Sequence, residues 1–210
     1  MKEYHKIESI FERNTDGSKK LIPGKYHNET VKFLANHVWS FTEKIDGTNI
    51  RVHWDGHTVQ FGGRTERAQI PVDLMNYLIS TFGGESNAQL FEQKFGETEV
   101  TLYGEGYGPK IQKGGGLYRD DVSFILFDVL IGDVWLTRES VEEIATCFGV
   151  DVVPVIFEGT LWEGVDFVKT KPRSHFGSAP MEGLVARPSV ELRDRLGRRV
   201  IVKIKVKDFD

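Results

Sequence analysis

Residues 41–54 carry the pattern that most restricts the fold of this chain. Apolar or β-branched residues alternate with polar ones in Phe41–Lys44 and in Thr48–Trp54, and the pair Asp46-Gly47 lies between the two runs. An Asp-Gly pair between two alternating runs is typical of a β-hairpin. The pattern therefore predicts a strand, a tight turn and a second strand, with Lys44 at the end of the first strand.

A lysine fixed at a strand end is a candidate nucleophile. It attacks only in its neutral form, and neighbouring cations favour that form. Asp46 and Asn49 would project from the same turn, where they could bind a ribose hydroxyl or a reacting phosphate. A single Lys-x-Asp-Gly also occurs in ordinary solvent-exposed hairpins, so the tetrapeptide alone does not decide between the two interpretations.

The rest of the chain reads as short strands with fewer helices, which predicts an α+β fold of antiparallel sheets with flanking helices. No linker-like tract interrupts it, so we expect a single domain over residues 1–210 and loops up to about residue 24. Two apparent capping boxes, Ser86 to Gln89 and Ser140 to Glu143, predict helix starts. Further helices are expected from Asn28 and Pro71, and further strands over 58–61, 99–103, 122–131, 152–157, 183–186 and 199–206.

Composition excludes several classes of protein. A hydrophobic content of 40% with 14 Phe indicates a folded globule, and no apolar run is long enough to span a membrane. A single cysteine, Cys147, excludes a disulfide framework and predicts a cytoplasmic location. The net charge of −4 argues against a typical nucleic-acid-binding protein, but the basic residues from Arg187 to Lys207 could still form a local basic groove.

Common catalytic motifs are absent. The sequence has no P-loop, no dinucleotide-binding Gly-x-Gly-x-x-Gly, no Gly-x-Ser-x-Gly and no spacing of histidines and cysteines that suits zinc. The run Gly104–Gly108 could cradle a phosphate, although a glycine-rich turn between strands is the simpler interpretation.

Charged residues stand instead at the ends of apolar strands. Glu105 follows one strand, Glu182 precedes another that Arg187 closes, and strand alternation places Lys203 and Lys205 on one face. Taken singly, each could be an exposed strand end or a polar sheet edge.

In order along the chain, these segments resemble the motifs of covalent nucleotidyltransferases, the superfamily of polynucleotide ligases and messenger-RNA capping enzymes. Within it, EKIDGTN and the final IKVK look most like the RNA ligases related to the second RNA ligase of the T-even phages and the trypanosome RNA-editing ligases. The segments that carry the resemblance are Lys44-x-Asp46-Gly47, Arg64, YGEG at 103–106, FILFD at 124–128, EGLV at 182–185 and VKIK at 202–205.

The resemblance implies an ATP-grasp-like ligase adenylation domain and a role for each matched residue. Lys44 would attack the α-phosphate of ATP to form a lysyl-adenylate, and Glu182 would bind Mg²⁺ or Mn²⁺. Asp46 and Arg187 are further candidate site residues. Arg187 stands at a position where such enzymes more often have lysine. The residues implied in nucleotide binding are Glu43, Asn49, Arg64, Glu105, Phe127, Lys203 and Lys205.

The implied activity is that of a monomeric ATP-dependent RNA ligase that acts on RNA ends or nicked duplexes in RNA repair. Because the chain ends at Asp210, soon after the last motif, we expect no C-terminal accessory domain. A minimal ATP-dependent DNA ligase is the nearest alternative. A capping-type guanylyltransferase is less favoured, and a ligase-derived nucleotide- or RNA-binding module without sealing activity is an alternative of another class.

Overall fold

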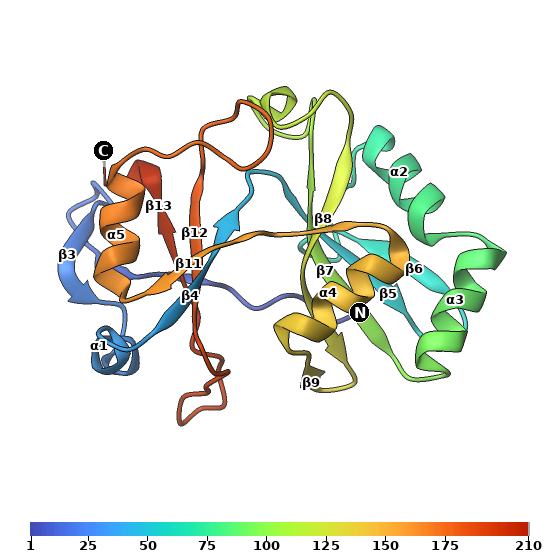
Figure 1. Cartoon of the computed structure of the whole chain (residues 1–210), viewed down its shortest axis with the longest axis horizontal. Helices are drawn as coiled ribbons and strands as arrows, with labels where there is room; N and C mark the ends of the chain where they lie inside the picture. Colours follow the sequence, from blue (N-terminus) through green and yellow to red (C-terminus); the bar gives the residue numbers. More distant parts are fainter. Residues whose placement is uncertain (210) are drawn as a thin grey trace. The chain divides into compact units, whose positions relative to one another are not determined.

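The computed structural model describes residues 1–209, which form two compact units (Figure 1). The six-stranded unit comprises Met1–His5 and Asp46–Val153, and the five-stranded unit comprises Lys6–Ile45 and the chain from Pro154 onward. Each unit has its own sheet and its own hydrophobic core. The predicted single domain over residues 1–210 stays a prediction.

The five-stranded unit is built on a sheet whose strand order is β1-β13-β12-β4-β11. β1 runs parallel to β13, and the other neighbouring strands are antiparallel. The sheet strands are β1 (Glu8–Ser9), β4 (Trp39–Lys44), β11 (Val155–Gly159), β12 (Gly183–Pro188) and β13 (Val202–Lys205). The unit also contains the pair β2 (Phe11–Arg13) and β3 (Leu21–Tyr26), the helices α1 (Glu29–Leu34) and α5 (Leu161–Lys169), and the 3-10 turn η2 (Val206–Asp208).

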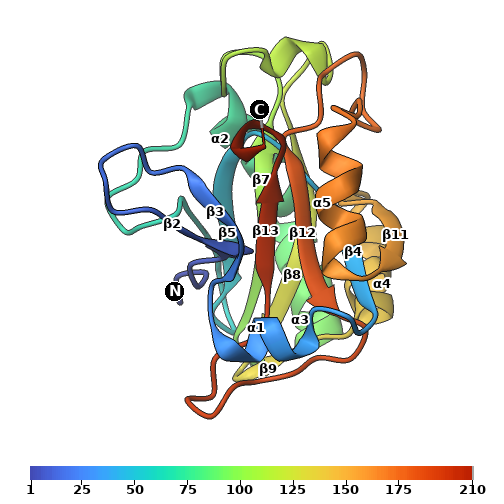
Figure 2. The same cartoon turned by 90° about the vertical axis from the view of Figure 1, so that its left-hand side faces the viewer.

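Helix α5 closes the core of this unit by packing on β12 and β13 (Figure 2). Its buried residues Leu161, Val165 and Val168 recur at helical spacing. Gly164 lies so close to the ring of Phe41 that a side chain would not fit between them. The apolar side of α5 thus holds β12 and β13 in place against the core.

The six-stranded unit has the strand order β10-β8-β7-β5-β6, with β9 paired to β8. β10 is parallel to β8 and the other pairs are antiparallel. The strands are β5 (Thr48–Trp54), β6 (Val59–Gly62), β7 (Val100–Tyr107), β8 (Ser123–Ile131), β9 (Val134–Trp135) and β10 (Asp151–Val152). The helices are α2 (Val72–Phe82), α3 (Glu85–Phe95), the 3-10 turn η1 (Gly115–Leu117) and α4 (Arg138–Phe148).

The helices of this unit cover one face of its sheet. Leu74, Leu78 and Phe82 of α2 are buried, as their spacing predicts. Four residues of α4 are buried as well, again as predicted: Val141, Ile144, Ala145 and Phe148. These side chains share one core with Ile50, Val52, Leu102, Phe124 and Leu126 of the sheet. The predicted α+β fold of antiparallel sheets with helices packed against them is confirmed.

The predicted hairpin around Asp46-Gly47 is wrong. β4 and β5 belong to different sheets, and Asp46-Gly47 lies where the chain passes from the five-stranded unit into the six-stranded unit. Alternation and an Asp-Gly pair describe each strand locally, but they do not reveal which strand becomes its neighbour. The strand expected over 152–157 likewise divides at Pro154 into β10 and β11, which belong to different sheets.

Helix starts were also mispredicted. Gly84, and not Ser86, is the N-cap of α3, and Thr137, and not Ser140, caps α4 through a hydrogen bond to the Ser140 N–H. The capping box that does form joins Thr160 to Glu163 at the start of α5, a helix missing from the sequence prediction.

Three strand predictions also change. The first 24 residues include β1, β2 and most of β3, where loops were expected. Gly104 and Gly106 lie inside β7, where a turn was the simpler interpretation, and of that run only Gly108 lies beyond the strand. The last strand ends at Lys205, so Lys207 lies in η2 and not on the strand. Within residues 1–209, no helix is long and apolar enough to cross a membrane.

Candidate active site

The five-stranded unit brings Lys44, Lys205 and Lys203 onto one face of its sheet. Lys44 of β4 is paired with Gly183 of β12, and Gly183 is paired in turn with Lys205 of β13. Residues directly opposite in antiparallel strands point to the same face. Lys203 follows in the next row on that face, opposite Val185. Val202 and Ile204 are buried on the other face, as the alternation predicts.

Glu182 bridges two of these lysines. Lys44 Nζ donates to Glu182 Oε2 at 2.7 Å, and Lys205 Nζ lies 2.5 Å from Glu182 Oε1. The three side chains are only 24%, 19% and 14% exposed for Lys44, Lys205 and Glu182, respectively. The carboxylate thus holds two ammonium groups beside each other in a partly desolvated position.

Gly183 makes this approach possible. A Cβ at this position would collide with the backbone carbonyl of Ile204 and lie 2.8 Å from the Cα of Lys205. Its lack of a side chain lets β12 and β13 pair closely.

Glu43 lies on the opposite face of β4 from Lys44, with the core residues Trp39 and Phe41. It is 1% exposed. Its Oε2 accepts the backbone N–H of His175 at 3.0 Å and lies 3.4 Å from His175 Nδ1. Oε1 is buried and has no hydrogen-bond partner within the described residues. Glu43 therefore anchors the loop between α5 and β12 at the end of the sheet where Lys44 lies.

Arg187 is at the far end of β12, paired with Ser40. It is on the same face as Gly183, two rows from Lys44, because residues four apart on a strand share a face. The structure thus separates Arg187 from the contacts around Glu182.

In the six-stranded unit, Asn49 and Glu105 form a second pair. They lie directly opposite each other on β5 and β7 and point to the same face, the one that the helices leave uncovered. Asn49 Oδ1 is buried without a hydrogen-bond partner in the part of the chain that the structure describes. An amide oxygen and a carboxylate side by side offer acceptors to ribose hydroxyls.

The segment that follows Lys44 is fixed by groups that the sequence did not reveal. The Asp46 N–H donates to the Tyr118 hydroxyl at 3.2 Å, and Gln112 Nε2 donates to the Gly47 carbonyl at 3.0 Å. A glycine is required at 47, because a Cβ there would meet the carbonyl of Gly106. Long-range contacts of this kind leave no local sequence signal.

Phe127 lies against the N-terminal segment. Its ring meets the ring of Tyr4 edge to face, with centroids 5.0 Å apart. The Tyr4 hydroxyl donates to Asp128 Oδ2 at 2.7 Å, and the Tyr103 hydroxyl donates to the Lys2 carbonyl at 2.9 Å. Burial raises the pKa of Tyr103 to about 12, which keeps this donor protonated. Tyr4 thus packs against the ring that the resemblance implies in nucleotide binding.

Two further observations bear on the predicted ligands. Arg64 is exposed just beyond the end of β6, in the six-stranded unit. Across residues 1–209, no group of three or more His, Cys, Asp and Glu residues is arranged to hold a metal ion by itself.

Comparison with known proteins identifies the family. The family model described as RNA ligase matches residues 37–205. The chain belongs to the RNA ligase family. The match includes every charged residue described above around Lys44. No curated protein matches this RNA ligase family member.

Solved structures of Naegleria gruberi RNA ligase are similar to this RNA ligase family member. A lysine-to-alanine mutant with ATP and Mn has a TM-score of 0.66 at 18% identity, covering 96% of this chain and 55% of that one. A glutamate-to-alanine mutant with AMP and Mn gives 0.67 at 18% identity, covering 98% and 56%. At this identity the likeness establishes the fold. The chain spans about half the length of the solved ligases.

Proposed function

We propose that this protein is an ATP-dependent RNA ligase that first adenylates itself on Lys44. The observation that carries the proposal is the arrangement of Lys44, Glu182 and Lys205 on one sheet face, joined by ion pairs of 2.7 and 2.5 Å. Phosphoryl transfer depends mainly on positioning and charge neutralisation, and this face supplies a lysine nucleophile, a carboxylate and a second lysine.

In the proposed first step, Lys44 Nζ attacks the α-phosphorus of ATP. The P–N bond forms, the bond from the α-phosphorus to the bridging oxygen breaks, and pyrophosphate leaves. The ammonium form of Lys44 must lose a proton before its nitrogen can attack, and Glu182 Oε2, at 2.7 Å, is placed to accept that proton. Lys205 and Lys203, on the same face, would neutralise charge that develops on the phosphates.

We assign nucleoside recognition to residues of the six-stranded unit. Asn49 and Glu105 form a pair of acceptors suited to ribose hydroxyls, and Phe127 offers a ring for adenine. Arg64 would contact ribose or phosphate, and Asp46 and Arg187 remain further candidates. Glu43 supports the site through its bond to His175, and its predicted contact with nucleotide stays a prediction.

The chemistry also calls for a divalent cation, Mg²⁺ or Mn²⁺. Mg²⁺ is commonly held by one or two carboxylates together with substrate phosphates, and a carboxylate lies beside Lys44. Glu182 is the carboxylate that would bind it, after exchanging an ion pair with lysine. The cation would supply charge neutralisation at the phosphates.

In the following steps, AMP passes from Lys44 to the 5′-phosphate of an RNA strand, and a 3′-hydroxyl then displaces AMP to form the phosphodiester. RNA ends or a nicked duplex are the proposed substrates, by family membership.

Labelling with nucleotide tests the proposal. The protein is incubated with α-labelled ATP or GTP and Mg²⁺ or Mn²⁺, and the labelled protein is followed by gel and intact mass. We expect an AMP adduct with ATP, its absence in Lys44→Ala, and full labelling of Lys169→Ala, a surface lysine of the same unit. Labelling of Lys44→Ala would refute the role of Lys44 as the nucleophile. A GMP adduct would indicate a capping-type enzyme. Sealing assays on matched RNA and DNA nicks would distinguish an RNA ligase from a DNA ligase.

A further inference from the structure

A basic hairpin extends from the end of β12 that lies away from Lys44. In this hairpin, residues 189–199, Arg193 is paired with Arg199 across the two arms. Asp194 fixes the turn: its Oδ1 accepts the N–H groups of Leu196 and Arg198 at 2.8 and 3.0 Å, and its Oδ2 accepts Arg198 Nε at 2.7 Å. The segment is therefore an ordered element that can present side chains in fixed positions.

The hairpin carries an excess of positive charge. Its two carboxylates are both paired, Glu191 with Arg199 and Asp194 with Arg198. Arg193 and Arg195 are exposed and make no ion pair within residues 1–209; Arg193 Nη1 only reaches the Gly197 carbonyl at 3.5 Å. Two guanidinium groups therefore remain available to an anion, on a chain whose net charge is −4.

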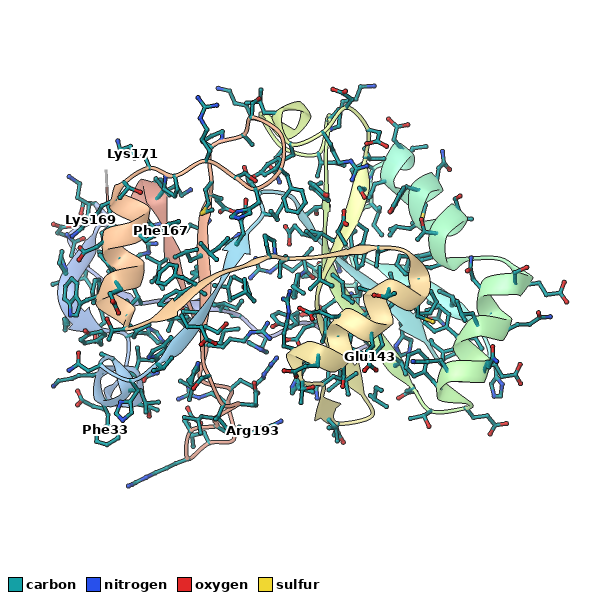
Figure 3. All side chains as sticks on the ribbon, in the orientation of Figure 1. Phe33, Glu143, Phe167, Lys169, Lys171 and Arg193 are labelled. Atoms are coloured by element: carbon teal, nitrogen blue, oxygen red, sulfur yellow. The ribbon has the colours of Figure 1, made fainter. Side chains whose placement is uncertain are left out.

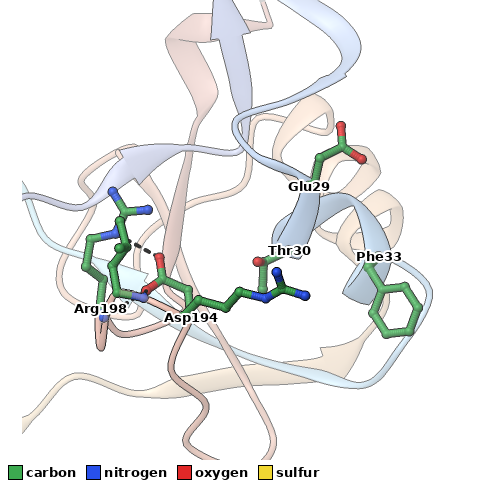
Figure 4. Close-up of a pocket in the computed structure, with 7 residues that line it drawn as sticks. Glu29, Thr30, Phe33, Asp194 and Arg198 are labelled. Carbon is green, nitrogen blue, oxygen red and sulfur yellow. Dashed lines mark hydrogen bonds and ion pairs between the residues drawn. The ribbon is translucent and has the colours of Figure 1, made fainter.

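Beside this hairpin is a pocket of about 440 Å³, bounded on its other side by α1 (Figure 4). Phe33 of α1 and Leu196 of the hairpin line it and are 77% and 76% exposed, respectively. Figure 3 shows Phe33 and Arg193 both pointing outward from this end of the unit. The other lining residues are Glu29, Thr30, Asp194, Arg195 and Arg198.

An exposed aromatic ring that lines the same pocket as the unpaired Arg195 suits one kind of ligand. Unpaired bases stack on aromatic rings, with roughly 1–3 kcal/mol per base, while cations beside the ring bind the backbone phosphates. Arginine also stacks on bases and binds phosphate with two hydrogen bonds. Neither property requires a particular base sequence.

We propose that the hairpin and α1 form an RNA-docking surface that binds an unpaired stretch of the ligation substrate. A base would stack on Phe33, against Leu196, and Arg193 and Arg195 would hold the adjoining phosphates. The identity of the ligand as RNA rests on the proposed ligase function, whereas the surface itself rests on the charges and the pocket.

The distance between Lys44 and the hairpin determines which nucleotides of the RNA this surface can contact. β12 has six residues and runs from Gly183, beside Lys44, to Pro188, where the hairpin begins. At about 3.3 Å per residue, this strand spans roughly 20 Å. A stacked strand advances about 3.4 Å per nucleotide, so bases docked beyond the end of β12 lie at least roughly six nucleotides from the reacting end.

Binding of two fluorescent RNAs by the full chain tests the proposal. Both carry the same short duplex and 5′-phosphate, and one has in addition an unpaired extension of about ten nucleotides beginning near the sixth position from the reacting end. The variants are Phe33→Ala and Arg195→Ala. Their controls are Val134→Ala, an exposed apolar residue, and Lys94→Ala, an exposed cation, both in the six-stranded unit.

We expect the wild type and both controls to bind the extended RNA at least fivefold more tightly than the blunt RNA. Phe33→Ala and Arg195→Ala should each lose most of this preference, and Arg195→Ala should lower the salt dependence of binding by about one unit of slope. Self-adenylation, which needs no RNA, should be unchanged in all four variants. A preference retained by both variants, or absent from the wild type, would overturn the docking surface. Failure of the wild type to adenylate would instead refute the proposed function.

Discussion

Glu182 lies between Lys44 and Lys205 and bonds to both, with distances of 2.7 and 2.5 Å. Lys44 is on β4, Lys205 is on β13, and Glu182 directly precedes β12, which lies between them. Gly183 of β12 is paired with Lys44 on one side and with Lys205 on the other. In this arrangement the carboxylate counters the repulsion between the two ammonium groups. Binding of ATP would replace that carboxylate by phosphate oxygens, which frees Glu182 for a proton or a cation.

Replacing Lys44 should abolish self-adenylation without unfolding the protein. When Lys44 is removed, Glu182 keeps its ion pair with Lys205, so no carboxylate is left buried without a cation. We expect the wild-type adduct to be lost in acid and to survive alkali, as a phosphoramidate does. Lys44→Ala and Lys44→Arg should both remain unlabelled, with thermal unfolding close to that of the wild type. An adduct that resists acid would rule out a link to nitrogen.

Glu182→Gln should lower the rate of adenylation by at least tenfold. The amide keeps the size of the side chain but can neither accept the Lys44 proton nor bind a cation well. Single-turnover labelling over a range of Mg²⁺ and Mn²⁺ concentrations measures the effect. Glu158→Gln, on the exposed face of β11, is the matched control and should label normally. Equal rates for the two variants would mean that Glu182 only pairs with the lysines.

The three lysines near the end of the chain should differ in importance. Lys205 bonds to Glu182, Lys203 lies in the next row, and Lys207 has left the strand. We therefore expect Lys205→Ala to slow adenylation by tenfold or more, Lys203→Ala to slow it less, and Lys207→Ala to stay within about twofold of the wild type. The order is read from single-turnover rates at saturating ATP. A defect in Lys207→Ala as large as that in Lys205→Ala would contradict the observed strand end.

Gly183→Ala should destabilise the protein and impair the site together. The added methyl group would collide with the Ile204 carbonyl, so β12 and β13 must separate. We expect a loss of about 2 kcal/mol or more in the free energy of unfolding, measured in urea. Gly116→Ala is the control, since its nearest atom would be 4.0 Å away. A normal stability for Gly183→Ala would show that these strands can move apart freely.

Protonation of His53 should weaken the fold in mild acid. Desolvation lowers the pKa of His53 below its ordinary 6.5, and the positive N-terminus adds to this effect. The unfolded chain then binds the proton more readily than the folded chain, so stability is lost as the pH falls below about 6.5. The difference in unfolding free energy between pH 7.5 and 5 should shrink in His53→Gln and stay unchanged in the exposed variant His57→Gln. An equal difference in all three proteins would refute the assignment.

Much of the local structure followed from the sequence. Helix α2 and the buried face of α4 were predictable because apolar residues recur at 3.6-residue spacing. The shared face of Lys203 and Lys205 was predictable because a strand alternates every residue. Helix α5 could have been found from its Thr160–Glu163 capping box.

The site was only partly predictable. The sequence singled out Lys44, Glu182 and Lys205, because their order along the chain resembles that of known ligases. It gave no indication that Glu182 contacts both lysines, or that Glu43 turns away to bind His175. Tyr4 was missed altogether, since it lies 124 residues from Asp128 in the chain.

The sequence by itself determined the periodic elements and the order of the motifs, because both depend on residues near one another in the chain. Tertiary structure alone decided which strands became neighbours. The Asp46-Gly47 turn looks like a hairpin locally, yet β4 pairs with β12 and β11, and β5 pairs with β7 and β6. The physical reason is that each strand buries its apolar face in a different core, and the burial of that face outweighs the local preference of a dipeptide for a tight turn.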